Sequence, residues 1–297
     1  MGVKNSRLNF SKKSPKQKGP QSNCHDLWTS LKTGEKSEHD EKEHLQHVII
    51  KELFKANFSS PIHNILSDPD AKILDVGCGS GFWLLEMVAD YSTPKYFGID
   101  NLSTFPTSTV PSNVKFTQHD LLEGLPFPDD TFEFVHIQST GSEFTEAQWE
   151  TFVYKELARV LKPGGWLEVC DPEIEFSNCG PTLKQLNLTV CNCLMARNVN
   201  PQMALRHQSL IKSLPIFSNV IHEKGHIQMG NYTHKIAKIS TMSLKEACRD
   251  AYKGPIGKIM KIDPKEVDSL SDKIEIECEL YKPYYFYHRV CAQKVIT

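Results

Sequence analysis

The feature that most restricts the fold of this chain is a regular alternation of short apolar strands and helical segments between residues 72 and 170. Strands are predicted at residues 72–76, 96–99, 114–118, 132–138 and 166–170, and helices at 82–89 and 146–161. Strands that alternate with helices at this spacing form βαβ units. The sequence therefore predicts an α/β fold with a doubly wound, mostly parallel, Rossmann-like sheet and helices on both faces.

The chain divides into a polar tail and one ordered domain. Residues 1–40 are rich in Lys, Ser, Gln and Asn and lack hydrophobic periodicity, which predicts disorder. Residues 41–297 are predicted to form the domain, with a cofactor-binding half at about 41–173 and substrate-side helices and last strands at about 174–297. Outside the alternating region we expect helices at 41–55, from Pro61, across 181–214, at 235–252 and at 264–280, and strands at 217–228 and 284–295.

Composition narrows the partners and the compartment. With 34 basic and 36 acidic residues the net charge is −2, so no nucleic-acid partner is expected. No apolar run approaches the ~20 residues of a membrane span, and no signal-peptide core follows Met1. We expect a cytoplasmic protein, with the nucleus as the alternative.

The cysteines indicate free thiols. There are nine, an odd number, and none forms a C-x-x-C pair, as is typical of a reducing compartment. The cluster of Cys179, Cys191 and Cys193 lacks the second close pair of a structural zinc site. The sequence therefore predicts no metal site.

The first 20 residues contain six lysines and arginines and no acid. The chain also begins Met-Gly-Val-Lys-Asn-Ser, and Gly2 followed by Ser6 fits the N-myristoylation pattern. One acyl chain binds membranes only marginally, and a basic stretch is the usual second signal. The tail is therefore either a peripheral membrane anchor acylated at Gly2 or a solvated basic segment.

A glycine loop follows the first strand of the alternating region. The strand ends at Asp75 and Val76 and runs into Gly77-x-Gly79-x-Gly81 before a helix, an arrangement that brings backbone close to a ligand. The dinucleotide fingerprint is G-x-G-x-x-G, and here the third glycine arrives one residue earlier. Asp75 could meet an ammonium group and would repel a pyrophosphate.

Two more acids follow the next two strands. Asp100 ends the strand at 96–99, where the hydroxyls of a ribose need acceptors. Asp120 follows the strand at 114–118 and could accept a hydrogen bond from an adenine amino group, with Leu121 as a backbone donor and an apolar wall. Asp100 and Asp120 could instead cap helices.

These motifs resemble class I S-adenosylmethionine-dependent methyltransferases of the methyltransferase-domain type. One fungal branch, which includes regulators of secondary metabolism, is similar over residues 43–47 (EHLQH), 98–103 (GIDNLS), 110–116 (VPSNVKF), 125–136 (LPFPDDTFEFVH) and 157–169 (LARVLKPGGWLEV). Strong similarity covers residues 41–173, and the C-terminal part is similar mainly at 227–232 (IQMGNY) and in the aromatic last strand. The resemblance implies a seven-stranded sheet whose last strand is antiparallel, S-adenosyl-L-methionine as cofactor, and a small molecule or a protein as methyl acceptor.

Candidate site residues follow from this position on the sheet. Those expected to bind the cofactor are Asp75, Gly77, Gly79, Gly81, Asp100, Asp120, Leu121 and Gln138. The backbone carbonyl near Ile137 or Gln138 is expected to receive the ammonium group. Methyl transfer needs alignment and exclusion of water more than a catalytic side chain. The candidate bases are His136 and Asp171, followed by Glu143 and Glu173. His47 on the N-terminal helix could cap the cofactor or only pack the helix. His136 could instead be a core histidine, and Asp171 could only shape a turn.

The function predicted is methyl transfer from S-adenosylmethionine to an unidentified acceptor. One alternative is a non-catalytic regulator that binds the same cofactor. A second alternative, an NAD-dependent oxidoreductase, is disfavoured by the glycine spacing and by Asp120.

Overall fold

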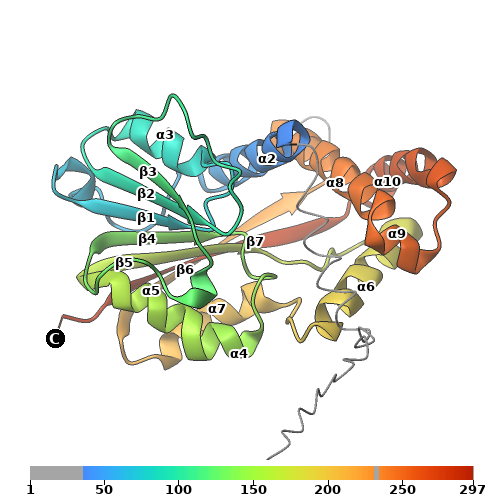
Figure 1. Cartoon of the computed structure of the whole chain (residues 1–297). Helices are drawn as coiled ribbons and strands as arrows, with labels where there is room; N and C mark the ends of the chain where they lie inside the picture. The colour runs from blue at the N-terminus through green and yellow to red at the C-terminus, as the bar shows by residue number, and fades with distance from the viewer. Residues whose placement is uncertain (1–35, 231–233, 297) are drawn as a thin grey trace, which may run out of the picture.

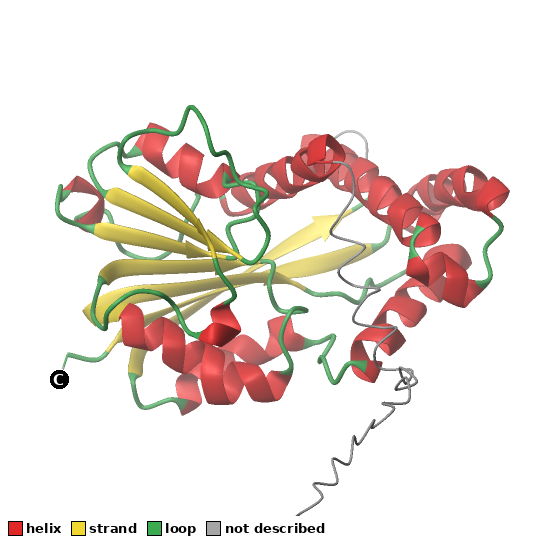
Figure 2. Cartoon of the chain, in the orientation of Figure 1, coloured by secondary structure: helices red, strands yellow, loops and turns green. Residues whose placement is uncertain are grey.

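The computed structural model describes residues 36–230 and 234–296. Residues 1–35 of the tail predicted to be disordered (residues 1–40), with the acylation motif at Gly2 and the basic stretch, lie outside these residues. Residues 36–40 belong to the first helix of the described chain, so the predicted end of the tail was wrong. The described chain forms one seven-stranded sheet in the order β3-β2-β1-β4-β5-β7-β6, with helices on both faces (Figures 1 and 2). The strands are β1 (Lys72–Val76), β2 (Lys95–Asp100), β3 (Val114–Gln118), β4 (Phe132–Gln138), β5 (Leu161–Pro172), β6 (Phe217–Gln228) and β7 (Tyr284–Lys294).

The strand directions confirm the predicted sheet. Strands β1 to β5 pair in parallel, whereas β7 runs antiparallel to both of its neighbours, β5 and β6. The last strand in the sequence therefore lies inside the sheet, and β6 lies at its edge.

Both faces of the central strands are covered, which explains why β1 and β4 are mostly buried. Ile73 and Phe134 face a core under α3 (Phe82–Asp90). Their neighbours in sequence, Leu74 and Val135, face the opposite core, under α5 (Tyr154–Val160) and α7 (Met203–Ser213). Consecutive strand residues thus alternate between two cores.

A separate group of helices lies beyond the strand ends, on the right in Figure 1. It consists of α6 (Pro181–Ala196), α8 (Lys235–Lys253), α9 (Pro255–Met260) and α10 (Val267–Tyr281), with the 3-10 turn Pro264–Glu266 before α10. Its core includes Leu183, Leu244, Ile256 and Ile274. The N-terminal helix α2 (Lys36–Phe54) packs against α8 and α3.

Several predicted boundaries were wrong. The helix expected from Pro61 is only a 3-10 turn at Ile65–Ser67. The helix expected at 146–161 consists of α4 (Glu146–Gln148), a π-helical segment at Trp149–Val153, and α5. The helical region at 181–214 is broken between α6 and α7. Strand β5 begins at Leu161, because the turn at residues 162–165 is a bulge within it, and α9 was not predicted.

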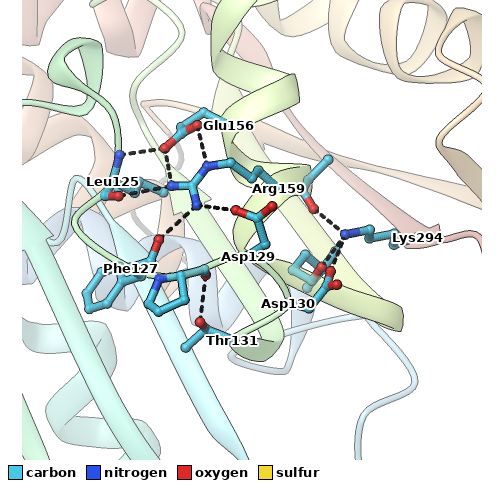
Figure 3. A network of polar contacts seen from close by, with 11 residues as sticks. Leu125, Phe127, Asp129, Asp130, Thr131, Glu156, Arg159 and Lys294 are labelled. Atoms are coloured by element: carbon cyan, nitrogen blue, oxygen red, sulfur yellow. Dashed lines mark hydrogen bonds and ion pairs between the residues drawn. The ribbon is translucent and has the colours of Figure 1, made fainter.

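A polar network fixes the loop before β4, as Figure 3 shows. Arg159 of α5 donates to both oxygens of Glu156, to Asp129, and to the carbonyls of Leu125 and Phe127. The hydrogen bond from Arg159 holds the pKa of Glu156 below its usual value, although burial opposes this shift. Beside it, Lys294 of β7 donates to Asp130 at 2.6 Å. The network ties α5 and the end of β7 to one loop.

In the described ranges, 36–230 and 234–296, no helix is long and apolar enough to span a bilayer.

Candidate active site

A cavity of about 740 Å³ lies where the parallel strands end at their carboxyl edge. Its wall combines the ends of β1, β2 and β4 with residues of α2, α6 and α8. In open α/β sheets this edge is where ligands bind. The cavity therefore lies where the sequence places the cofactor site.

The glycine loop forms one wall of the cavity. Gly77, Gly79 and Gly81 have φ of +70°, +51° and +79°, a backbone conformation that side chains disfavour. A Cβ on Gly79 would lie 2.5 Å from a carboxylate oxygen of Glu43, and one on Gly77 would lie 2.8 Å from Thr140. Both glycines line the cavity, so the loop approaches its surroundings too closely for any side chain.

Gly81 lies behind this wall. It precedes α3 as the N-cap residue and does not line the cavity. A Cβ there would lie 2.6 Å from the ring of Phe116. Gly81 thus packs the loop against β3, and the structure does not place it where it could touch a ligand.

Asp100 and Asp120 both line the cavity, together with Leu121. Asp100 accepts from the N–H of Gly79 at 3.0 Å and of Leu102 at 2.8 Å, so it connects β2 to the glycine loop. Asp120 accepts from the N–H of Leu122 at 2.9 Å and caps the 3-10 turn Leu121–Glu123. The capping alternative is thus realised for Asp120. Each carboxylate has lone pairs beyond these bonds for a ligand donor.

Asp75 and His136 form a buried pair in the cavity wall. Asp75 is 2.8 Å from Nδ1 of His136, its register partner on β4. The His136 ring stacks on Trp83 with centroids 4.0 Å apart. Its Nε2 is buried and has no hydrogen-bond partner in the described part of the chain. His136 thus combines the core packing and the cavity position that the sequence left as alternatives.

The polar row continues across the sheet below the cavity. His136 is in register with Glu168 of β5, and Glu168 with Cys291 of β7. Burial works to raise the pKa of Glu168, but the nearby charge of Arg289 and hydrogen bonds from Ser60 bring that pKa below its usual value. Glu168 does not line the cavity. It lies in the core beside His136, which does line the cavity.

Asp171 does not line the cavity. It is 1% exposed, accepts from the N–H of Gly141 at 3.0 Å, and lies 2.6 Å from Nε2 of His207 on α7. The Nδ1 of His207 in turn contacts the hydroxyl of Tyr154. The side chain of Asp171 thus lies on the α7 side of the sheet. Its hydrogen bond to Gly141 holds the loop after β4 in position. The structure gives no support to Asp171 as a base that reaches a substrate.

The other candidate bases, Glu143 and Glu173, line the cavity, and so does His47. Glu173 contacts Nε2 of His288 at 2.8 Å and Nζ of Lys224 at 3.4 Å. His47 of α2 contacts Glu86, and burial lowers the pKa of His47 despite that carboxylate. Glu143 lies in the same wall, just after the loop that Asp171 holds.

Gln138 ends β4 at the cavity. Its Oε1 is buried without a hydrogen-bond partner within the described ranges, and so are the hydroxyls of Ser139 and Thr140. Ser139 has a φ of +57°, a strained conformation for a residue with a side chain. Unsatisfied acceptors and strain gathered in one cavity wall are typical of a ligand site.

Comparison with known protein families identifies this region. Residues 73–165 match the model of the methyltransferase domain family. Over these residues the chain is similar to methyltransferase domains. The match spans β1 to the start of β5, including the glycine loop, Asp100 and Asp120, and it confirms the resemblance predicted from the sequence.

The domain is similar to fungal proteins over a larger part of the chain. Methyltransferase str3 of Strobilurus tenacellus is 26% identical over 203 residues, 66% of this chain and 69% of that protein. Secondary metabolism regulator laeA of Coprinopsis cinerea is 26% identical over 148 residues, 49% of this chain and 36% of that protein. The chain thus spans about a third of the length of laeA.

Among solved structures, phosphoethanolamine N-methyltransferase 2 of Haemonchus contortus, in complex with S-adenosyl-L-methionine, is 14% identical with a TM-score of 0.49. The alignment covers 84% of this chain and 51% of that one.

Two parts of the cavity wall come from outside residues 73–165: one from α2, where the sequence predicted His47 but neither Glu43 nor Gln46, and one from α6 and α8, which were predicted only as substrate-side helices. From α2, Glu43 accepts from the N–H of Ser80 at 2.6 Å, and Gln46 donates to the hydroxyl of Tyr287. The spacing of Glu43, Gln46 and His47 on one helix face could have indicated the first part. The second part, from α6 and α8, has no polar motif in the sequence.

Proposed function

We propose that this protein is a methyltransferase that uses S-adenosyl-L-methionine as its methyl donor. The observation that carries the proposal is the meeting of the glycine loop, Asp100 and Asp120 at one cavity, from the ends of three adjacent strands. This order of contacts suits an adenosine with a charged amino-acid tail.

The residues fit the groups of that cofactor. The acceptors of Asp100 suit ribose hydroxyls, and Asp120 with Leu121 suits the adenine. An ammonium group finds an unpartnered acceptor in Oε1 of Gln138. When bound, the cofactor supplies a methyl group activated by its sulfonium. The chain's own contribution is to hold the acceptor in line and to exclude water.

Calorimetry of the full chain with S-adenosylhomocysteine and with NAD⁺ tests the proposal. We expect binding of the first and none of the second. In Asp100→Asn one charged acceptor is lost, so the affinity should fall by roughly 10–100-fold. Asp70→Asn, an exposed acid 3.5 Å from Lys95, is the matched control and should bind as the wild type does. Binding of NAD⁺ alone would overturn the proposal.

A regulator that binds the cofactor without turnover is the second candidate, and it is supported by the similarity to laeA, a secondary metabolism regulator. Incubation with methyl-labelled cofactor and fractions of a cell extract separates the two. Label that enters one fraction identifies the acceptor as a small molecule or a protein. Tight binding without transfer into any fraction favours the regulator.

A further inference from the structure

The cavity has an apolar half that the cofactor groups leave unused. It is formed by side chains of α6, α8 and the strand ends, here called the acceptor wall: Phe176, Leu183, Leu186, Val190, Met229, Leu244, Cys248, Ala251 and Tyr285. We propose that the acceptor wall binds the methyl acceptor, and that this acceptor is a small, largely apolar molecule with one hydroxyl or carbonyl oxygen. This inference rests on the proposed function.

The acceptor wall is the interior of the helical layer. Every one of its residues belongs to the core cluster of α6, α8, α9 and α10 or packs against it. Leu183 and Met229 are each 1% exposed, and yet both line the cavity. The cavity therefore extends into a hydrophobic core. Binding an apolar molecule there removes apolar surface from water on both sides.

The polar side chains of α6 and α8 that line the cavity are Asn187, Ser240 and Ser243. The amide of Asn187 donates to the carbonyl of Ile174 at 2.7 Å and accepts from the N–H of Phe176 at 3.2 Å. Ser240 of α8 is 2% exposed, and its hydroxyl has no hydrogen-bond partner in the part of the chain described here. A buried hydroxyl without a partner is unfavourable, and one ligand oxygen would satisfy it.

Because few polar groups line this side of the cavity, a polypeptide is disfavoured as its occupant. A peptide segment would bring main-chain N–H and C=O groups against aliphatic and aromatic side chains, where they would lose water without gaining partners. The charged groups nearest in the chain are Glu173, just after β5, and Arg197, just after α6, and both line the cavity outside the apolar cluster that forms the acceptor wall.

The test uses the full-length protein saturated with S-adenosylhomocysteine, and 1-naphthol as the probe. Calorimetry should show one naphthol bound per chain. Ala247 of α8 is exposed and lines the cavity, so Ala247→Trp should block the probe and leave the fold intact. Met242→Trp, on the same helix at a position 52% exposed and away from the cavity, is the matched control and should bind as the wild type does.

Ser240→Ala tests the single polar contact. This variant should bind 1-naphthol roughly 3–10-fold more weakly, and should bind naphthalene as the wild type does. Loss of affinity for both probes would contradict the assignment of Ser240.

Binding of S-adenosylhomocysteine separates the two proposals. If that compound binds and 1-naphthol does not, or if Ala247→Trp leaves naphthol binding unchanged, the acceptor wall is wrongly assigned and the proposed function stands. If neither compound binds, the proposed function fails as well. Methyl transfer into a protein fraction that Ala247→Trp does not reduce would also overturn the inference.

Discussion

Gly79 is the residue of the glycine loop that is constrained by its backbone conformation, a hydrogen bond and a close contact at once. Its backbone is left-handed, its N–H donates to Asp100, and the space that a Cβ would take lies 2.5 Å from Glu43. Gly79→Ala therefore adds both strain, of about 1–2 kcal/mol, and a collision at the cavity. We expect the affinity for S-adenosylhomocysteine, measured by calorimetry, to fall at least roughly 10-fold.

Gly124 provides the matched control. It is also left-handed, at φ +85°, but its Cβ would meet nothing closer than 3.6 Å and it lies off the cavity wall. Gly124→Ala should lower the free energy of unfolding by a similar strain and leave the affinity for S-adenosylhomocysteine unchanged. Equal losses of affinity in both variants would show that strain alone, and not the approach to the cavity, determines the effect.

At the scale of secondary-structure elements, much of the sheet could be predicted because its information is local. The strands β1 and β2 are short apolar runs that end at the glycine loop and at Asp100. The edge strand β6 at Phe217–Gln228 matches its predicted bounds. The π-helical segment at Trp149–Val153 could not be predicted, because its sequence has the hydrophobic spacing of an ordinary α-helix. Its Trp149 and Val153 are buried by tertiary packing, which the sequence does not show. The helix α9 was missed because Gly254 and Pro255 together read as a break.

The site was predictable to the same extent. Asp75, Asp100 and Asp120 could be placed at the cavity because each lies at or within two residues of a strand end. Their contacts with the cofactor stay a prediction. Asp171 also lies at a strand end, but the sequence does not give the face on which its side chain lies, so its distance from the cavity could not be predicted. The acceptor wall stayed hidden, since its residues come from segments more than 100 positions apart and look like ordinary core.

Glu277 joins two helices of the layer that carries the acceptor wall. This buried residue of α10 accepts from the N–H groups of Thr182 and Leu183 at 3.0 Å, in the first turn of α6. A carboxylate there also complements the helix dipole. Glu277→Gln should lower the free energy of unfolding in urea by about 1.5–3 kcal/mol.

Asp272→Asn tests whether this effect depends on the cap. Asp272 lies on the same helix and pairs at the surface with Lys245, so its replacement should change the unfolding midpoint little. Equal effects of the two substitutions would contradict a specific contribution from Glu277.

Across the whole molecule, the network around Arg159 makes stability depend on acid pH. The pKa of Glu156 is lower in the folded protein than its reference value of 4.5, chiefly through its hydrogen bond to Arg159. The contribution is therefore fully present above that reference value and is lost as the pH falls through the lower, folded pKa. In urea unfolding, Arg159→Leu should be less stable than the wild type at pH 7, and this gap should narrow below pH 4.5.

Lys155→Leu is the control for the pH measurement. Lys155 is exposed on the same helix, and any difference it makes should not vary with pH. A gap between wild type and Arg159→Leu that stays constant into acid would contradict the assignment to Glu156.

The N-terminal tail allows a prediction about the location of the whole protein. When the chain is produced together with an N-myristoyltransferase, acylation at Gly2 next to the basic stretch should bring it down with vesicles that contain anionic lipid. Gly2→Ala should remain in the supernatant. If both forms partition equally, the tail is a solvated basic segment.

The position of β7 has a consequence for synthesis. On the ribosome β6 emerges well before Tyr284–Lys294, the segment to which it pairs. Until that segment is released, β5 and β6 both expose unpaired edges to other nascent chains. The sheet can therefore close only after Tyr284–Lys294 has emerged, and a chain that lacks this segment would be prone to aggregation.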